Sequence, residues 1–374
     1  MSYYGEDFTK LGFGLMRLPT VDGKENEVDI EQVKKMVDLF FSRGFNYFDT
    51  AYLYNGGKSE VAFREAVVKR YPRESFHIVD KMPMWNINGL EDYERIFKEQ
   101  LERTGLEYFD LYYLHGIGAD RLETIDKTGG WDFLKSLKER GLAKHIGFSY
   151  HSPAEPLDKI LDAHPEVEVV QLQINYFDWD TETVQAHKCY DVARKHGVGI
   201  VIMEPVRGGA LAVMQPEMEK KLKDYAPDAS LASWALRWAA SLEGLTTVLS
   251  GMSDLAQVED NTKTMMDFKP LTDEERAIID GIVEDFKKIP TIPCTSCKYC
   301  VNSCPMNINT PAIIGFINEY ERFPNLAPIK RRYGMTAGRG GKASDCVYCR
   351  SCEDHCPQNL PITDILARAA NLFE

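Results

Sequence analysis

The sequence predicts an α/β protein built as a (β/α)8 TIM barrel, followed by a smaller, mainly helical unit at its C-terminal end. Before residue 290, eight short apolar runs alternate with eight amphipathic stretches. Eight strand–helix pairs in about 270 residues are typical of a closed parallel barrel. After residue 290 the composition changes, because eight of the nine cysteines lie there. These two observations predict the fold class.

The expected strands are largely apolar, as is usual for parallel strands covered by helices. They span residues 11–17, 45–50, 76–82, 109–115, 143–149, 167–172, 198–204 and 246–251. Periodic stretches predict helices at 30–43, 59–71, 91–104, 131–140, 154–163, 181–196, 228–241 and 254–267. A doubly wound sheet is the alternative, but it favours a Gly-rich turn after its first strand, and no G-x-G-x-x-G is present.

Charge supports a domain boundary near residue 290. Nine Lys/Arg and seven Asp/Glu follow this point, a net of +2, which leaves −15 for the rest of a chain whose total is −13. We therefore expect a barrel domain over residues 1–289 and a second domain over 290–374. The acidic total argues against a nucleic-acid partner. Residues 1–7 do not form a leader pattern, and no apolar run reaches membrane-spanning length, so we expect a cytoplasmic protein without a membrane partner.

The cysteines repeat one spacing, C-x2-C-x2-C-x3-C-P, in two segments. This run is typical of proteins with two 4Fe–4S clusters, in which the fourth cysteine of each run ligates the other cluster. A structural zinc site does not require the third cysteine of each run or the proline after the fourth. A disulfide framework is not expected in a chain that is otherwise poor in cysteine. The predicted ligands of one cluster are Cys294, Cys297, Cys300 and Cys356, and those of the second are Cys346, Cys349, Cys352 and Cys304. Cys189 is expected to be an inert, partly buried thiol.

The segment around the cysteines is expected to be helical. Residues 311–322 and 361–372 have helical apolar patterns, and no strand is evident, so the tail resembles the helical type of dicluster ferredoxin. Residues 322–342 hold six Lys/Arg and no acidic residue. We interpret this basic run as a solvated loop; the alternative is a surface that docks an acidic partner or the acidic barrel.

In a barrel of this kind, chemistry belongs at the C-terminal ends of the strands. Asp49, Lys81 and His115 end the second, third and fourth expected strands, and Tyr54 follows in the loop after the second. Residues 8–268 resemble the aldo-keto reductases. The resemblance is carried by these four residues and by the segments PheAspThrAlaTyrLeuTyr at 48–54 and LeuTyrTyrLeuHisGly at 111–116. With the cysteine tail, the chain is similar to the ferredoxin-fused branch of that family.

The resemblance implies NAD(P)H-linked interconversion of an aldehyde or ketone and an alcohol. Tyr54 would donate the proton, and Lys81, held by Asp49, should lower the pKa of that phenol. His115 would orient the carbonyl. A core histidine and a structural ion pair are the alternatives for single members of this set.

The resemblance also implies positions for the nicotinamide cofactor. Ser149 and Gln171 match residues that hydrogen-bond the carboxamide, and Met203 stands where many relatives stack an aromatic ring. Relatives that prefer NADPH carry Lys and Arg after the eighth strand, whereas Gly251 and Gln257 stand here, which also admits NADH. The remaining expected cofactor residues are Arg17, Glu204, Arg207, Gly208, Ser253 and Asn261.

Two other functions remain open from the sequence. The barrel could bind nicotinamide without carbonyl turnover, in an electron-transfer or redox-sensing protein, or the clusters could be purely structural. We expect a small carbonyl or alcohol substrate, a redox protein as a further partner and a source with little oxygen. The sequence does not show the identity of the substrate, the direction of the reaction or the oligomeric state. It also does not show how the clusters and the barrel communicate, because no flavin signature is present that would convert between a hydride and single electrons.

Overall fold

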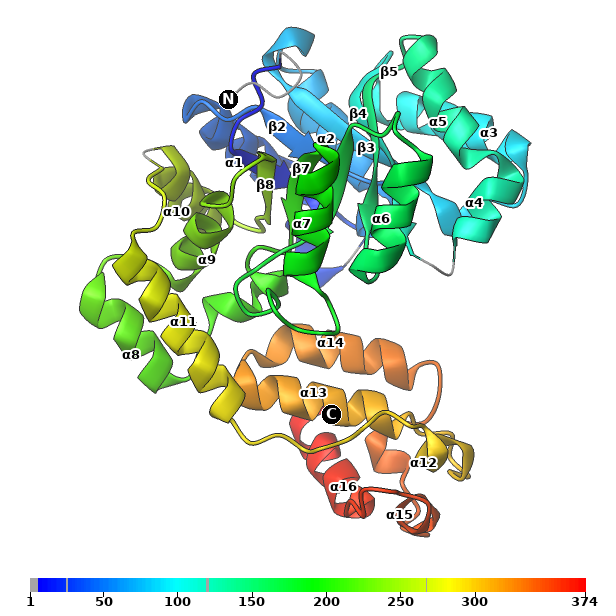
Figure 1. Cartoon of the computed structure of the whole chain (residues 1–374), viewed down its shortest axis with the longest axis vertical. Coiled ribbons are helices and arrows are strands. Elements are labelled where there is room, and N and C mark those ends of the chain that lie inside the picture. Colours follow the sequence, from blue (N-terminus) through cyan, green and yellow to red (C-terminus); the bar gives the residue numbers. More distant parts are fainter. Residues whose placement is uncertain (1–5, 25, 119–120, 267) are drawn as a thin grey trace. The chain divides into compact units, whose positions relative to one another are not determined.

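The computed structural model describes residues 6–24, 26–118, 121–266 and 268–374. Eight parallel strands close into a barrel in chain order, so the predicted (β/α)8 fold is confirmed (Figure 1). Residues 1–5, on which most of the leader prediction rests, lie outside the described residues, as does residue 267. The strands are β1 Leu11–Gly14, β2 Tyr47–Asp49, β3 His77–Pro83, β4 Phe109–Ile117, β5 Ala143–Tyr150, β6 Val169–Gln173, β7 Gly199–Met203 and β8 Leu245–Gly251.

Helices follow the strands, and several begin or end close to their predicted limits. The helix expected at 59–71 is instead short and changes into a π-helical turn at Arg64–Val68, and the helix expected at 181–196 begins only after Gln185, whose φ of 53° interrupts it. The helices that end before residue 290 are α1 Ile30–Ser42, α2 Ser59–Phe63, α3 Leu90–Thr104, α4 Leu122–Thr128, α5 Gly130–Glu139, α6 Ala154–Ala163, α7 Ala186–His196, α8 Pro216–Tyr225, α9 Leu231–Ala240, α10 Leu255–Met266 and α11 Asp273–Lys288.

The first strand is shorter than predicted. It ends at Gly14, which pairs with Asp49 of β2 and Gly251 of β8, the last residues of both neighbours. Without strand partners beyond this point, the chain turns into a short 3-10 helix at Leu15–Arg17. Arg17 is therefore not a strand residue, although it still lies at the C-terminal end of the barrel.

The barrel interior is filled by side chains from alternate positions of the strands. Gly147 of β5 belongs to the same packing, because an added Cβ would lie 2.0 Å from the carbonyl oxygen of Val169 in β6. A larger residue at this position would force two paired strands apart. The interior cluster consists of Tyr47, Val79, Leu111, Tyr113, Val169, Val201 and Leu249, with Phe8 packed against it.

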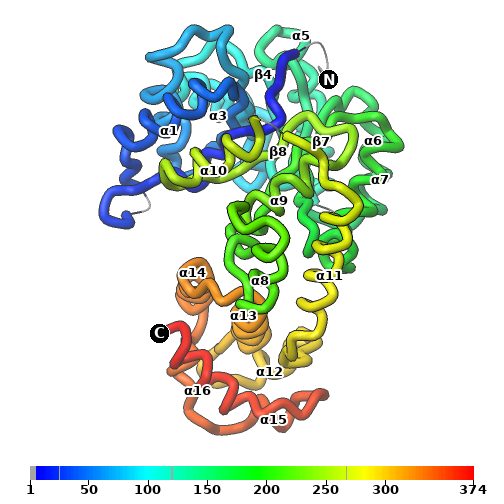
Figure 2. The backbone as a smooth tube through the Cα atoms, turned by 90° about the vertical axis from the view of Figure 1, so that its left-hand side faces the viewer, coloured from blue at the N-terminus to red at the C-terminus, as the bar shows by residue number. Residues whose placement is uncertain are grey.

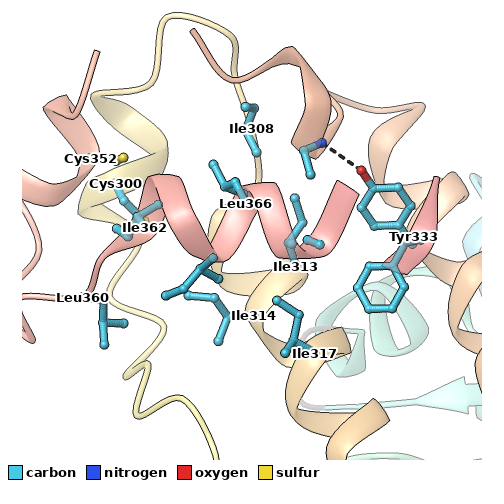
Figure 3. Close-up of a cluster of buried hydrophobic side chains, with 14 of the residues drawn as sticks. Cys300, Ile308, Ile313, Ile314, Ile317, Tyr333, Cys352, Leu360, Ile362 and Leu366 are labelled. Atoms are coloured by element: carbon cyan, nitrogen blue, oxygen red, sulfur yellow. Dashed lines mark hydrogen bonds between the residues drawn. The ribbon is translucent and has the colours of Figure 1, made fainter. Parts of the chain in front are cut away.

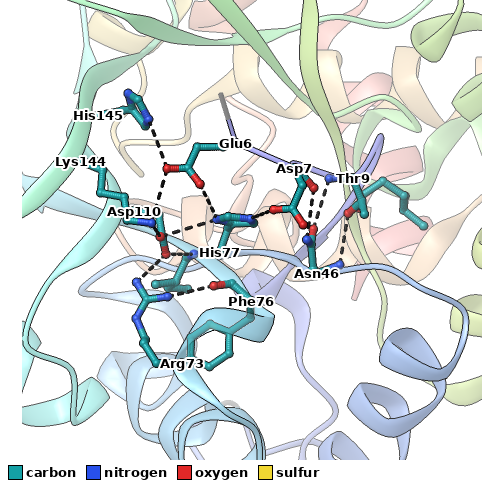
Figure 4. A network of polar contacts seen from close by, with 12 residues as sticks. Glu6, Asp7, Thr9, Asn46, Arg73, Phe76, His77, Asp110, Lys144 and His145 are labelled. Carbon is teal, nitrogen blue, oxygen red and sulfur yellow. Dashed lines mark hydrogen bonds and ion pairs between the residues drawn. The ribbon is translucent and has the colours of Figure 1, made fainter. Parts of the chain in front are cut away.

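A charged network closes the N-terminal end of the barrel (Figure 4). At its centre, His77 Nε2 lies 2.6 Å from Asp7 Oδ1, and its Nδ1 lies 3.6 Å from Asp110 Oδ1. Burial opposes a charge on His77, but hydrogen bonds and charges from Asp110 and Asp7 raise its pKa. Arg73 and Lys144 pair with Asp110 at 2.6 and 3.0 Å, so the carboxylates here are balanced by cations within the chain.

The chain divides into two compact units, one formed by Gly209–Leu231 with Ala277–Glu374 and one by the remaining residues. This division by packing places α8 and most of α11 with the cysteine segment. The boundary at residue 290 rests on sequence and stays a prediction. The further helices of this unit are α12 Tyr299–Asn302, α13 Thr310–Arg322, α14 Leu326–Ala337, α15 Ser351–Asp354 and α16 Ile362–Phe373.

The cysteine-bearing unit has an internal repeat. Each cysteine run contains a four-residue helix, α12 or α15, and leads into a long helix, α13 or α16, at the same spacing. Figure 2 shows α13, α14 and α16 lying side by side. Their apolar faces form one core, with Cys300 and Cys352 at one end of it (Figure 3). Among the described residues of this unit, the only β-pairing is an isolated bridge between Ile308 and Gly341.

Helix α14 corrects the prediction of a solvated loop at 322–342. Ile329 and Tyr333, four residues apart, are buried against the neighbouring helices and give the segment one apolar face. Tyr333 also accepts a hydrogen bond from the backbone N–H of Ala343 at 2.8 Å. The charged residues dominated the sequence pattern and concealed this short apolar stripe.

Candidate active site and cysteine sites

Four predicted residues meet at the C-terminal end of the barrel. Asp49 is the last residue of β2, Lys81 and His115 lie near the ends of β3 and β4, and Tyr54 begins the 3-10 turn after β2. Lys81 Nζ lies 2.6 Å from Asp49 Oδ1 and 5.0 Å from the centre of the Tyr54 ring. The rings of Tyr54 and His115 meet edge to face at 5.8 Å.

Lys81 is fully buried and held as a cation. Its ammonium group donates to Asp49 Oδ1 and to the backbone carbonyl of Thr50 at 2.7 Å. Burial favours the neutral amine, but the charge of Asp49, together with its hydrogen bond and the charges of Tyr54 and Asp80, raises the pKa of Lys81. Gln171 Nε2 donates to the other oxygen of Asp49 at 3.1 Å, so both carboxylate oxygens are fixed.

The phenol of Tyr54 is a weaker acid than the sequence analysis expects. Burial raises its pKa, and the positive charge of Lys81 lowers it only in part. The direction of the Lys81 effect agrees with the expectation, but the net shift is opposite. In this structure Tyr54 is a protonated phenol at neutral pH, which is the form a proton donor requires.

His115 is a neutral imidazole. Burial, then the positive charge of Lys81, holds its pKa well below the usual range. Its Nδ1 is buried and has no hydrogen-bond partner among the residues that the structure describes. A neutral ring can donate to a carbonyl oxygen without adding a second full charge beside Lys81.

A cavity of about 320 Å³ opens beside His115. Trp85 packs on His115 with ring centres 4.8 Å apart, and Arg121 donates to the carbonyl of Gly116 at 2.8 Å. His151 lies on the same wall, and its pKa is lowered by desolvation and by the charges of Arg121 and Lys81. Arg121 and His151 were not predicted from the sequence, because both lie in loops whose approach to this cavity is determined only by the closed barrel.

The expected carboxamide-binding residues lie on neighbouring strands of the same barrel end. Ser149 of β5 pairs in register with Gln171 of β6, and both are buried. The Ser149 hydroxyl accepts from the backbone N–H of Gly116 at 2.7 Å, which leaves its own proton available. Met203 ends β7 and is half-buried.

The loop after β7 turns sharply. Glu204 and Arg207 have positive φ of 59° and 52°, and Gly208 has 63°. Arg207 Nε is paired with Asp178 at 3.2 Å, and Arg17 reaches Glu204 at 3.9 Å. The pairing with Asp178 fixes Arg207, a constraint that the sequence did not reveal.

The segment after β8 forms a capped start of α10. Asp254 accepts from the backbone N–H of Gln257 at 2.8 Å and from its side chain at 3.0 Å. The Ser253 hydroxyl donates to the carbonyl of Arg17 at 2.7 Å, and Asn261 Nδ2 donates to Ser250 at 2.9 Å. Gly251 approaches the Arg17 side chain, where an added Cβ would lie at 3.3 Å.

The first predicted cysteine set converges. One cavity is lined by Cys294, Cys297, Cys300 and Cys356, so the fourth cysteine of the second run reaches the first run. Burial raises the pKa of the Cys300 thiol, and the other three cysteines raise it further. In the second set, burial raises the pKa of the Cys352 thiol, and the nearby charges of Glu353 and then Cys346 raise it further.

The distances between the cysteine sulfurs also distinguish between a zinc ion and an iron–sulfur cluster. A tetrahedral zinc ion with Zn–S bonds near 2.3 Å brings its sulfurs to roughly 3.8 Å from one another. Among the described residues, no three cysteine sulfurs lie within 4.8 Å of one another. A cluster of four irons holds its thiolates farther apart, so the sites fit clusters better than zinc.

The two cysteine loops share one backbone conformation. Left-handed residues recur at matching places, Ser296 and Lys298 in the first loop and Tyr348 and Arg350 in the second. Such turns point successive N–H groups to one side, where they favour a negatively charged group. The chemistry and the backbone of both loops therefore fit iron–sulfur clusters.

Comparison with known proteins matches the two parts of the chain to two families. The profile of the aldo/keto reductase family matches residues 10–284, and that of the 4Fe-4S dicluster domain matches residues 293–360. "Probable aldo-keto reductase 1" of Glycine max is 34% identical over 214 residues, which cover 55% of this chain and 58% of that protein. L-galactose dehydrogenase of Arabidopsis thaliana is 24% identical, over 76% of this chain and 93% of its own.

Solved structures show the same fold. The holo form of an aldo-keto reductase from Bacillus halodurans matches with a TM-score of 0.59 and 26% identity, over 73% of this chain and 91% of its own. An aldo/keto reductase from Klebsiella pneumoniae in complex with NADP and acetate matches with a TM-score of 0.59 and 18% identity, over 74% and 92%. No helix within the described ranges is long and apolar enough to cross a membrane. The chain is an oxidoreductase that belongs to the aldo/keto reductase family and carries a C-terminal 4Fe–4S dicluster domain.

Proposed function

We propose that this oxidoreductase reduces an aldehyde or ketone to an alcohol with NADH or NADPH, and reverses the reaction when the alcohol is in excess. The observation that carries the proposal is the contact of Lys81 with both Asp49 and Tyr54 beside a neutral His115. A bound reduced nicotinamide supplies a hydride. The chain itself must orient the carbonyl and provide the proton.

Each residue of this group has a separate task. His115 hydrogen-bonds the carbonyl oxygen and turns the carbonyl carbon toward the cofactor. Tyr54 gives its phenolic proton to the oxygen as negative charge develops there. Lys81, kept charged by Asp49, stabilises the phenolate that remains.

We propose that the cofactor lies along the C-terminal ends of β5 to β8. Ser149 and Gln171 hydrogen-bond its carboxamide, Met203 packs on the nicotinamide, and the turn at Glu204–Gly208 approaches its phosphates. Gly251 and Gln257 stand where relatives that prefer NADPH carry Lys and Arg, and Asp254 lies nearby, which supports use of NADH as well as NADPH. Arg17, Gly251, Ser253, Gln257 and Asn261 complete the proposed site.

We propose that the eight cysteines hold two 4Fe–4S clusters with crossed fourth ligands. The support is the convergence of Cys356 with the first run and the shared backbone of the two loops. When bound, such clusters accept and donate single electrons.

The test is an anaerobic assay of carbonyl-dependent NADH and NADPH oxidation over a panel of aldehydes and ketones. We expect Tyr54→Phe to lower kcat by at least about 100-fold, the usual size of a general-acid effect. Tyr52→Phe is the matched control, because its hydroxyl lies on the same loop but donates to Glu99 at 2.8 Å. Full activity of Tyr54→Phe, or no turnover by the wild-type protein, would contradict the proposal.

A further inference from the structure

A cationic cavity lies beside the first cysteine loop. It has a volume of about 520 Å³, and Lys298, Arg332 and Arg339 line it together with Phe316 and Met335. Lys298 stands between Cys297 and Cys300, so whatever fills the cavity approaches the first proposed cluster. The assignment of these cysteines as ligands of a cluster rests on the proposed function.

Among the described residues, only one of these three cations has a counter-charge. Arg332 is paired with Glu319 at 2.5 Å. Lys298 and Arg339 are exposed, and neither forms an ion pair with any residue in the described part of the chain. Residues 322–342, which contribute one side of the cavity, contain no acidic residue. Exposed positive charges without counter-charges attract an acidic partner.

The position of Arg339 is fixed by close backbone packing. Gly340 and Gly341 lie against the segment that follows Cys304, where an added Cβ would come within 2.6 Å of the Asn307 carbonyl and 2.3 Å of the Met306 carbonyl. Gly341 also donates to the carbonyl of Asn307 at 3.2 Å. The fold thus holds the basic segment against the first cysteine run.

The surface also has apolar character suited to a protein partner. Met335, at the edge of the cavity, is 58% exposed, and the cluster ligand Cys297 is exposed as well. Methionine and arginine are enriched in protein interfaces, and electron-transfer encounters use small patches of this kind. A small anion alone would gain nothing from the apolar wall.

From this arrangement we infer that the face formed by Lys298, Arg339 and Met335 docks an acidic, single-electron carrier protein. A reduced carrier gives one electron to the oxidised cluster held by Cys294, Cys297, Cys300 and Cys356. The carrier is oxidised by one electron, the cluster is reduced by one electron, and no proton or bond is exchanged. The reverse transfer uses the same contact.

Anaerobic stopped-flow mixing with a reduced, acidic 2Fe–2S ferredoxin tests this inference, with cluster absorbance as the readout. We expect the second-order rate constant of the wild-type protein to fall steeply with salt. We expect Lys298→Glu/Arg339→Glu to lower it at least about tenfold at low salt and to flatten its salt dependence. Arg339→Glu alone, which lies outside the cysteine loops, should give a smaller loss in the same direction.

The matched control is Lys35→Glu/Lys135→Glu, which makes the same change in charge at two exposed positions of α1 and α5. Iron content and dithionite-reduced EPR spectra establish that each variant holds its clusters. Equal rate constants for Arg339→Glu, the double variant and the control would overturn the inference while leaving the proposed function intact. Carbonyl-dependent NAD(P)H oxidation, measured on the same samples, tests the proposed function separately.

Discussion

At the residue scale, the structure changes the expected acidity of Tyr54. The sequence predicts Tyr54, Lys81, Asp49 and His115 as candidate catalytic residues, because the strand ends and their spacing can be recognised in it. It does not show that burial raises the pKa of Tyr54 more than Lys81 lowers it. Desolvation depends on every neighbour in space, and the sequence order of four residues does not contain that information.

A pH dependence follows from this raised pKa. Carbonyl reduction needs the protonated phenol and should vary little between pH 6 and 8, whereas alcohol oxidation needs the phenolate and should increase toward pH 10, roughly the ordinary pKa of tyrosine. Lys81→Met removes the positive charge that partly offsets the raised pKa of Tyr54. The alkaline limb of the pH–rate profile for alcohol oxidation should therefore move to higher pH. Initial rates across this range measure it, with the exposed Lys58→Met as control. A limb that stays in place or moves to lower pH in Lys81→Met would show that Lys81 does not act on Tyr54.

At the element scale, the alternation of apolar and amphipathic segments was enough to predict eight strands and the barrel order. The segments that the sequence analysis missed or misjudged have short or interrupted apolar patterns. Helix α14 has only Ile329 and Tyr333 to mark its buried face, and β1 ends at Gly14 because its neighbours end there. Strand ends depend on partners, which a single segment does not reveal.

The crossing of the cysteine runs gives a prediction about pairs of variants. If Cys297 and Cys356 ligate one cluster, the double variant Cys297→Ala/Cys356→Ala should lose about four irons per chain, no more than either single variant. The double variant Cys297→Ala/Cys304→Ala should lose both clusters. Iron and sulfide analysis of anaerobically purified protein measures the difference, and the uncrossed arrangement predicts the opposite result for the two pairs.

At the scale of the whole barrel, the charged network around His77 should make stability depend on pH. Because Asp110 and Asp7 raise the pKa of His77 in the folded protein, its contribution is fully present below about pH 6.5 and is lost as the pH rises through the folded value. Thermal unfolding of wild type and His77→Gln should differ more at pH 6 than at pH 9. His187→Gln, an exposed histidine on α7, is the control. A difference that grows with pH would contradict the assigned charge state.

The proposed function assigns a hydride-transfer site to the barrel and single-electron clusters to the cysteine segment, so its central claim is that carbonyl reduction uses the hydride. The most direct measurement is an anaerobic single turnover with nicotinamide deuterated at the transferred position, followed by mass spectrometry of the alcohol. We predict one deuterium on the former carbonyl carbon of each alcohol molecule, and no labelled alcohol from Tyr54→Phe on the same time scale. Alcohol that carries only solvent hydrogen at that carbon would show that the electrons arrive by another route, and the account would be wrong.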